Sequence, residues 1–575
     1  MILQELCRYY DRLAADPETG VAPLGNVVQG VAFAVVVDES GKLLGIQDLR
    51  DLDGKVKRNK QMVLPGKAKP SGAGMNPSLH GWDRTDYMLG YLDPDPLDPS
   101  EKASKLARCV KAHEAYKQAM LEQEKSFAQP DYSAFCRFLE RWKAEMAADH
   151  PLLKEVSGLF GVVRIAGAKP RYLHDLPQFQ EGGAPETGKT DGYCLVTGQP
   201  ACIAKTHDIK IKGVAGAQSS GAALVSFNLD AFESYGREQS FNAPVGKDAA
   251  FKYATALNRL LERDSGRRVQ IGDATCVFWA DAPSKGEDIF GFGLSGEQAE
   301  DSDAARSIEA ALKSLKDGTA KAPDAETGFH VLGLSPNASR LSVRFWYSST
   351  LGEMLDRVAC HQQELDIARS QNDRDLIPAW LILAQTARES KDAPPLLSGA
   401  LLRAILTGGR YPEALYTAIL RRIQADRTVS HPRAATIKAI LTRNHAKEGL
   451  AMLDPGRPEP AYQLGRLFAA LEKPQEDALP SINATVKDRY FGAASATPGT
   501  VFPRLIRMSQ HHIGKLEGGR KVVAEKRVQE ICGHIDQFPS HLDLVGQGLF
   551  ALGYYHQRQD FFTKKPDADQ NSRPD

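Results

Sequence analysis

The chain has 575 residues, of which 42% are hydrophobic and 25% charged, and its 72 basic and 72 acidic side chains give a net charge of zero. This length predicts three or four domains, and the balanced charge excludes a histone-like protein that binds nucleic acid through bulk charge. The eight cysteines include no CxxC pair, and no run of eighteen uncharged apolar residues occurs. We therefore expect a reduced, cytoplasmic protein with no metal, no cofactor and no membrane span.

Strand and helix patterns alternate over residues 1–350, which predicts an α+β region of mixed strands and helices. A boundary between subdomains is expected near residues 150–190. The elements expected up to that boundary are a helix over 1–15, a hairpin of Val31–Val37 and Leu43–Leu49 closed by Asp38-Glu39-Ser40-Gly41, helices over 101–126 and 131–149, a strand at Leu159–Ile165 and a polar loop over 166–192. Those expected after it are strands at Tyr193–Val196, Ala201–Ala204 and Ala223–Asn228, a helix from about 246 to 263, a strand at Thr275–Ala280, an acidic, mobile stretch over 283–304 and a strand-rich unit over 329–349.

Long helical patterns follow from about Leu351, separated by Pro and Gly breaks. They predict an all-α C-terminal part, with a helical connecting region over 351–450 and a helical bundle over 451–560. The polar tail over 561–575 is expected to be disordered.

One short motif raises an enzymatic alternative. The run Ala217–Gly221 fits a loosened nucleophile elbow with Ser219 at its centre. That elbow requires a core strand before the serine and a helix after it, whereas basic, glycine-rich residues precede Ser219 and a strand-like run follows. We therefore expect no catalytic residue, and a serine hydrolase built on Ser219 is kept as an alternative.

The segment Lys205–Lys247 combines lysines, glycines and short polar side chains. Lysines and the amides of glycine-rich loops position phosphates, and Gln and Asn can read base edges. The candidate DNA contacts here are Lys205, Lys210, Lys212, Gln218, Ser219, Ser220, Asn228, Gln239, Asn242 and Lys247. A solvated hairpin with polar turns is the alternative structural interpretation.

A second basic stretch runs from Lys55 to Lys69, with six basic residues and no acidic one, and Trp82 and Tyr87 follow it. Such a stretch could track a phosphate backbone. Its candidate contacts are Lys55, Lys57, Arg58, Lys60, Lys67, Lys69 and Asn76.

Several long sequence boxes, in this order, are more specific than any short motif. They are MILQELCRYYDRL at the start, VVVDESGKLLGIQDLRD, WDRTDYMLGY, the block from CLVTGQPACIAKTHDIKIKGVAGAQSSGAALVSF to KYATALN, IGDATCVFWAD, and FHVLGLSPNASRLSVRFW. On these boxes the chain resembles the large subunit of the subtype I-C CRISPR Cascade surveillance complex over most of its length.

The resemblance implies a non-catalytic role in RNA-guided antiviral defence. A large subunit of this kind recognises the protospacer-adjacent motif (PAM) in double-stranded DNA, helps to start R-loop formation and to hold the displaced strand, and recruits a separate helicase–nuclease. The implied partners are guide RNA, target double-stranded DNA, the backbone, 5′-handle-binding and small subunits, and that helicase–nuclease. PAM recognition and docking to the complex would belong to residues 1–350.

The resemblance also implies that the bundle over 451–560 is similar to the Cascade small subunit, which in this subtype can arise by internal translation; Met452 is the candidate start. The candidates for contact with the displaced strand are Arg504, Arg507, Lys515, Arg520, Lys521 and Lys526. A purely structural bridging subunit without DNA contact is the second alternative.

Overall fold

The computed structural model describes residues 2–53, 56–66, 69, 74–127, 129–167, 171–181, 191–296, 302–389, 392–479 and 485–562. The chain forms two compact units, the first made of Met1–Ile211 and Ala223–Arg259 and the second of Lys212–Ala222 and Leu260–Asp575. Mixed strands and helices are followed by a helical C-terminal part, so the predicted fold class is confirmed. None of the described helices is long and apolar enough to cross a membrane.

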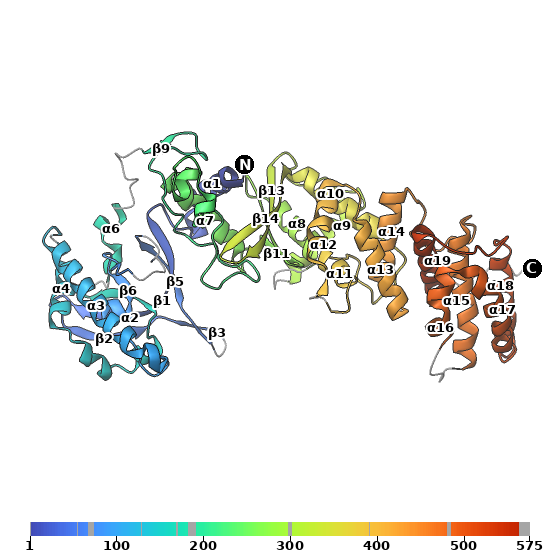
Figure 1. Cartoon of the computed structure of the whole chain (residues 1–575), viewed down its shortest axis with the longest axis horizontal. Coiled ribbons are helices and arrows are strands. Elements are labelled where there is room, and N and C mark those ends of the chain that lie inside the picture. The colour runs from blue at the N-terminus through green and yellow to red at the C-terminus, as the bar shows by residue number, and fades with distance from the viewer. Residues whose placement is uncertain are drawn as a thin grey trace, which may run out of the picture. The chain divides into compact units, whose positions relative to one another are not determined.

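A mixed six-stranded sheet organises the first unit (Figure 1). Its strands are β2 (Leu43–Asp48), β1 (Asn26–Asp38), β7 (Phe160–Ala166) and β6 (Trp82–Arg84) in that order, with β5 (Lys60–Pro65) also on β1 and β8 (Arg171–Tyr172) on β7. Strand β1 is parallel to β7 and antiparallel to β2 and β5. The predicted hairpin of β1 and β2 is confirmed, and Gly41 adopts the positive φ of 81° that its turn requires.

Helices α3 (Pro99–Glu124) and α4 (Pro130–Arg141) pack on one face of this sheet, against Phe33, Val35 and Val37. The helix predicted over 131–149 was too long. It ends at Arg141 because Trp142 turns away in an extended conformation and buries its indole, whose Nε1 donates to the Leu89 carbonyl at 2.9 Å. A 3₁₀ helix at Ala144–Asp149 follows.

Smaller elements complete the first unit. They are β3 (Asp51–Asp53) paired with β4 (Val56–Arg58), α2 (Thr85–Met88), α5 (Leu152–Glu155), α6 (Pro177–Glu181), and β9 (Gly192–Tyr193) paired with β10 (Pro200–Ala201). The loop predicted over 166–192 therefore contains β8 and α6, while residues 182–190 and the predicted tail from 563 lie outside the described residues.

The predicted first helix, α1 (Ile2–Ala14), pairs with α7 (Lys247–Leu261), the helix predicted near residues 246–263. The Cys7 thiol lies 3.5 Å from the Ala249 carbonyl oxygen, and the rings of Tyr10 and Phe251 meet edge to face at 5.8 Å. Both helix predictions are confirmed, and α7 supports the loop that precedes it.

The second unit begins with the antiparallel sheet β11 (Arg268–Ile271), β12 (Ala274–Ala280), β13 (Gly328–Asn337) and β14 (Arg340–Thr350). The strands predicted at 275–280 and over 329–349 are confirmed. The stretch predicted to be acidic and mobile is instead partly helical, as α8 (Gly286–Ser295) and the start of α9 (Ser302–Lys316). In α8, Ile289 and Phe290 pack into the core. Glu287 is therefore buried, and its carboxylate accepts a hydrogen bond from the Ala280 amide at 2.9 Å.

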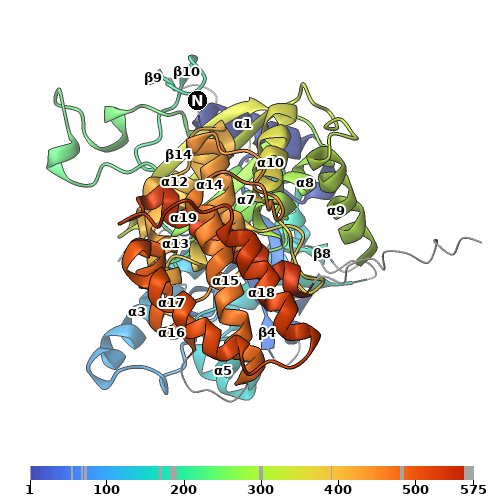
Figure 2. The ribbon, with the colours of Figure 1, turned by 90° about the vertical axis from the view of Figure 1, so that its right-hand side faces the viewer.

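Helices make up the rest of the second unit. They are α10 (Leu351–Leu365), α11 (Ala379–Ala384), α12 (Pro395–Thr407), α13 (Glu413–Asp426), α14 (His431–His445), α15 (Pro460–Ala478), α16 (Val486–Ala496), α17 (Pro498–Ile513), α18 (Gly519–Cys532) and α19 (Leu544–Phe562). Figure 2 shows α15 surrounded by α16 to α19. One apolar core continues from the sheet into these helices, so the predicted divisions at 350 and 450 do not interrupt the packing.

The helices α15 and α19 approach each other closely through two glycines. A Cβ atom on Gly465 would overlap the carbonyl oxygen of Phe550, and one on Gly553 would overlap the carbonyl oxygen of Tyr462. The two backbones therefore touch where any other residue would hold them apart.

We expect Gly465→Ala to lower the free energy of unfolding of the second unit by about 1–3 kcal/mol, the usual cost of overpacking a core. The matched control is Gly492→Ala in α16, where a Cβ meets nothing within 4 Å. Alanine should stabilise that helix by up to about 1 kcal/mol. Urea denaturation measures both, and equal stability of the two variants would contradict the close contact.

Candidate nucleic-acid interface

The segment Lys205–Lys247 is largely exposed and has little regular structure. Before α7 begins it contains two 3₁₀ turns, Asp230–Phe232 and Gln239–Asn242, and isolated β-bridges, one of which joins Ser234 to Arg237. The predicted strand Ala223–Asn228 is reduced to isolated bridge positions at Ala222 and Ala223, and no strand is present over the described residues 224–228, where the chain runs towards the exposed Asn228. The strands predicted at 193–196 and 201–204 shrink to the two-residue pair β9 and β10, because the turn at Gly198 closes early.

Within this segment, residues 228–242 form what we call the Tyr235 loop. Tyr235 is 98% exposed and has a φ of 55°, and Gly236 follows at 68°. A positive φ is uncommon for a tyrosine and costs about 1–3 kcal/mol, so the surrounding structure must impose it. The loop presents an aromatic ring to solvent at its tip.

Asn242 imposes that conformation. Its Oδ1 accepts from the Ser234 amide at 2.8 Å, and its Nδ2 donates to the carbonyls of Arg237 and Gln239 at 2.7 and 2.9 Å. The Gln239 amide in turn donates to a Glu233 carboxylate oxygen at 3.2 Å. The amide group of Asn242, predicted to contact a DNA groove, is therefore occupied inside the loop.

Lys205 and Lys210 are exposed side chains on an anchored backbone. The Lys210 carbonyl accepts from Asn258 Nδ2 at 3.0 Å, and the Lys205 carbonyl accepts from the Ser240 amide at 3.4 Å. Between them His207 is buried, with Nδ1 2.5 Å from the Tyr253 hydroxyl, and burial lowers its pKa to about 4. The histidine is thus neutral at pH 7, and the charge of this stretch comes from its lysines.

Residues 212–222 belong to the second unit and include the exposed turn that holds Gln218, Ser219 and Ser220. The Gly221 amide closes this turn on the Gln218 carbonyl at 2.9 Å, and the Ala215 amide fixes its base on Thr275 Oγ1 at 3.0 Å. Neither a strand before Ser219 nor a helix after it is present in the described segment 212–230. Ser219 therefore lacks the strand–turn–helix geometry of a nucleophile elbow.

The remaining candidates of this segment differ in exposure. Lys212 and Asn228 are exposed, whereas Gln239 and Lys247 are half-buried, Lys247 at the first turn of α7.

The basic residues over 55–69 differ in their surroundings. Lys57 lies 2.9 Å from Glu155 and 3.2 Å from Asp48, a carboxylate whose pKa is held low mainly by hydrogen bonds from Arg50. Arg58, Lys60 and Asn76 are exposed, and Lys55 and Lys67 lie outside the described residues.

Lys69 is half-buried beside the core of the first unit. Its ammonium group pairs with the buried Asp83 and lies 3.0 Å from the centre of the Tyr87 ring. Burial raises the pKa of the Asp83 carboxyl, while Lys69 and the amides of Ser78 and Arg84 oppose that rise. The WDRTDYMLGY box is accordingly explained by packing, since Trp82 and Tyr87 are buried as well.

The six displaced-strand candidates are all exposed. Arg504 and Arg507 lie on α17, Lys515 follows that helix, and Arg520, Lys521 and Lys526 lie on α18. Arg504 lies 5.5 Å above the Tyr490 ring, and no ion pair joins any of the six to an acidic group in the described part of the chain. Their charges are available to an anionic partner.

Sequence reasoning did not include Tyr235 among the candidate contacts, and its exposure at the tip of the loop is seen only in the structure. The sequence signal for a turn here was Gly236 within a polar run, since glycine adopts the positive φ that many turns require. Within either unit taken alone, no three His, Cys, Asp or Glu side chains of the described residues lie close enough to share a metal ion.

Two comparisons with known proteins bear on this site. A search of curated proteins found no match. A family model described as CRISPR-associated protein (Cas_Csd1) matches residues 6–562, which is nearly the whole chain and includes both units and the Tyr235 loop. The chain therefore belongs to the CRISPR-associated Cas_Csd1 family and is a Cascade-type subunit.

Proposed function

We propose that this chain is the large subunit of a subtype I-C Cascade complex and that it recognises the PAM in double-stranded DNA. In this role it helps to start R-loop formation, helps to hold the displaced strand and recruits a separate helicase–nuclease, without catalysis of its own. Family membership over residues 6–562 supports the assignment to a CRISPR complex. The guide RNA reads the target by base pairing, so the protein needs to read only the short flanking motif.

The observation that carries the proposal is the Tyr235 loop. Asn242 holds it in shape, while Tyr235 and Arg237 project into solvent at its tip. A preorganised loop loses less conformational entropy when it binds a ligand. Arginine can bind phosphate, and the tyrosine ring can contact a base. Lys205 and Lys210, which flank the buried His207, add phosphate contacts near the base of the loop.

The structure changes the set of contact residues that we propose. Lys57 and Lys69 are removed because acidic groups outside the basic stretch neutralise them, and Asn242 is removed as a direct contact because its amide is used internally. The other exposed candidates remain, and Tyr235 and Arg237 are added. Those that remain are Lys205, Lys210, Lys212, Gln218, Ser219, Ser220, Asn228, Arg58, Lys60 and Asn76. The hydrolase alternative is not proposed, because the turn that holds Ser219 lacks, within the described segment 212–230, the strand before it and the helix after it that a nucleophile elbow requires.

The C-terminal helices fit the proposed small-subunit relationship in one respect. Met452 is 69% exposed in the loop between α14 and α15, so translation that starts there leaves α15 to α19 intact. Such a product would lose its contacts with the preceding part of the second unit, among them the hydrogen bond from the Tyr555 hydroxyl to the carbonyl of Ala368, which lies after α10, at 2.7 Å. We propose that another subunit covers this face.

Changing Lys205, Lys210 and Lys212 together to alanine should weaken the binding of target duplex by the assembled complex, and to a similar degree for every flanking motif. Lysines that neutralise phosphates release counterions, so the slope of log K against log salt should flatten by up to about 2.7. Titration of labelled duplex at several salt concentrations measures both effects.

The control for this experiment is the triple change of Lys42, Lys111 and Lys143 to alanine, which removes the same charge from exposed positions of the first unit. Equal binding by both triple variants would support a bridging subunit that touches only protein.

Gln218→Ala should relax the preference of the assembled complex among flanking motifs while leaving its salt slope unchanged. A lost base-edge contact costs roughly 1–3 kcal/mol of discrimination, whereas phosphate contacts carry no sequence information. A binding panel over all flanking motifs measures the preference, with Gln371→Ala at another exposed glutamine as control. An unchanged preference would remove Gln218 from the residues that read the motif.

A further inference from the structure

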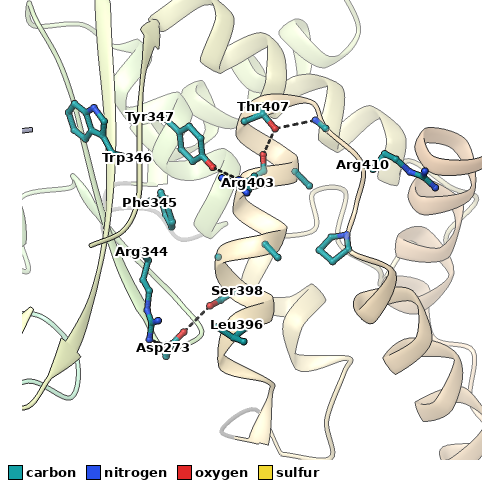
Figure 3. A pocket seen from close by; sticks show the side chains of 15 residues that line it. Asp273, Arg344, Phe345, Trp346, Tyr347, Leu396, Ser398, Arg403, Thr407 and Arg410 are labelled. Atoms are coloured by element: carbon teal, nitrogen blue, oxygen red, sulfur yellow. Dashed lines mark hydrogen bonds and ion pairs between the residues drawn. The ribbon is translucent and has the colours of Figure 1, made fainter. Parts of the chain in front are cut away.

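A pocket of about 630 Å³ lies in the second unit between strand β14 and helix α12. Figure 3 shows Tyr347 on the strand directed at Arg403 on the helix, and Arg344 directed at Asp273. This volume lies within the roughly 300–1,000 Å³ typical of small-ligand sites. None of the residues discussed for PAM recognition lines it.

Aromatic side chains form one wall of the pocket. Strand β14 has an irregularity in its register at Arg344, after which Phe345 and Tyr347 share one face, with ring centres 5.6 Å apart and planes at 29°. Trp346 points to the opposite face and stacks on His330 at 5.4 Å. Gly333, opposite Phe345 on β13, has no side chain, so the Phe345 ring lies across its backbone.

The charge of the pocket is positive. Arg344 is paired with Asp273 at 3.2 Å, and Arg410 at the rim approaches Glu413 at 3.5 Å, with both side chains exposed. Arg403 is exposed and, within the described residues, its guanidinium has a single polar partner, the Tyr347 hydroxyl at 3.3 Å. A neutral hydroxyl does not balance a guanidinium charge, so the pocket favours an anionic ligand.

A flat aromatic wall beside an uncompensated arginine matches the chemistry of one nucleotide in a single strand. Bases stack on aromatic rings largely independently of sequence, and arginine binds phosphate through a planar fork of donors. The exposed Leu396 at the same pocket adds apolar surface for the ring or sugar.

We infer that this pocket binds single-stranded nucleic acid, with one base against Tyr347 and Phe345 and the adjacent phosphate at Arg403. The inference rests on the proposed function, since an opened duplex or the guide provides the single strand. It adds a contact point in the second unit that is independent of motif recognition.

The test uses the purified full-length chain and twelve-nucleotide single strands of DNA and of RNA that carry one 2-aminopurine, a base whose fluorescence is quenched by stacking. Binding to the wild-type protein should quench the fluorescence of the probe. Arg403→Gln and Tyr347→Leu should each weaken binding at least about fivefold, which corresponds to the smallest free energy usual for the loss of one base stack, about 1 kcal/mol. Tyr347→Phe keeps the ring and should retain quenching. Arg421→Gln on α13 removes the same charge outside the pocket and should change nothing.

The outcomes separate the sources of the ligand. Weakened binding of DNA alone identifies the displaced strand, and weakened binding of RNA alone identifies the guide. Arg403 is exposed, so Arg403→Gln should leave the core intact. If this variant binds both strands as tightly as wild type does, the inference is overturned. It is also overturned if the variant no longer assembles into the complex while its binding of nucleic acid is unchanged. Because the probes contain no duplex, these results stand apart from the success or failure of PAM recognition.

Discussion

The proposed function depends on the three hydrogen bonds that Asn242 makes within the Tyr235 loop. These bonds pair the Ser234 amide and the carbonyls of Arg237 and Gln239 within the turn. They thereby hold the solvent-exposed Tyr235 at a φ of 55°. The loop is connected to α7, which packs on α1. A ring held in this way can stack on a base or insert between bases with little further loss of conformational entropy.

Charge compensation decides which basic residues can meet nucleic acid. Lys57 and Lys69 belong to a strongly basic stretch of the sequence, yet both form ion pairs with acidic side chains. The partners of Lys57 are Asp48 and Glu155, and the partner of Lys69 is Asp83. Arg403 lies in an unremarkable helical sequence and has only a tyrosine hydroxyl as its polar partner in the described part of the chain. A charge run in the sequence is therefore a weaker guide than the acidic groups that the fold brings to it.

Much of the fold could be predicted because local patterns determine it. The hairpin of β1 and β2, the helices α1 and α7, and the sheet strand β12 follow from periodicity and turn residues. Helix α8 was missed because acidic composition masked an apolar stripe, and the end of α4 depends on the tertiary contact of Trp142 with Leu89. The exposure of much of segment 205–247 follows from its polar composition, but the internal use of Asn242 depends on a loop conformation that no periodicity encodes.

The most direct test of the central claim is to place a photo-crosslinking amino acid at position 235 and to irradiate the guide-loaded complex with target duplex. The same amino acid at Leu52, which is 76% exposed on β3 of the first unit, serves as control. We expect a crosslink from position 235 to DNA at or beside the flanking motif, and none from position 52. Crosslinks from position 235 only to protein subunits, in a complex that still binds its target, would contradict it.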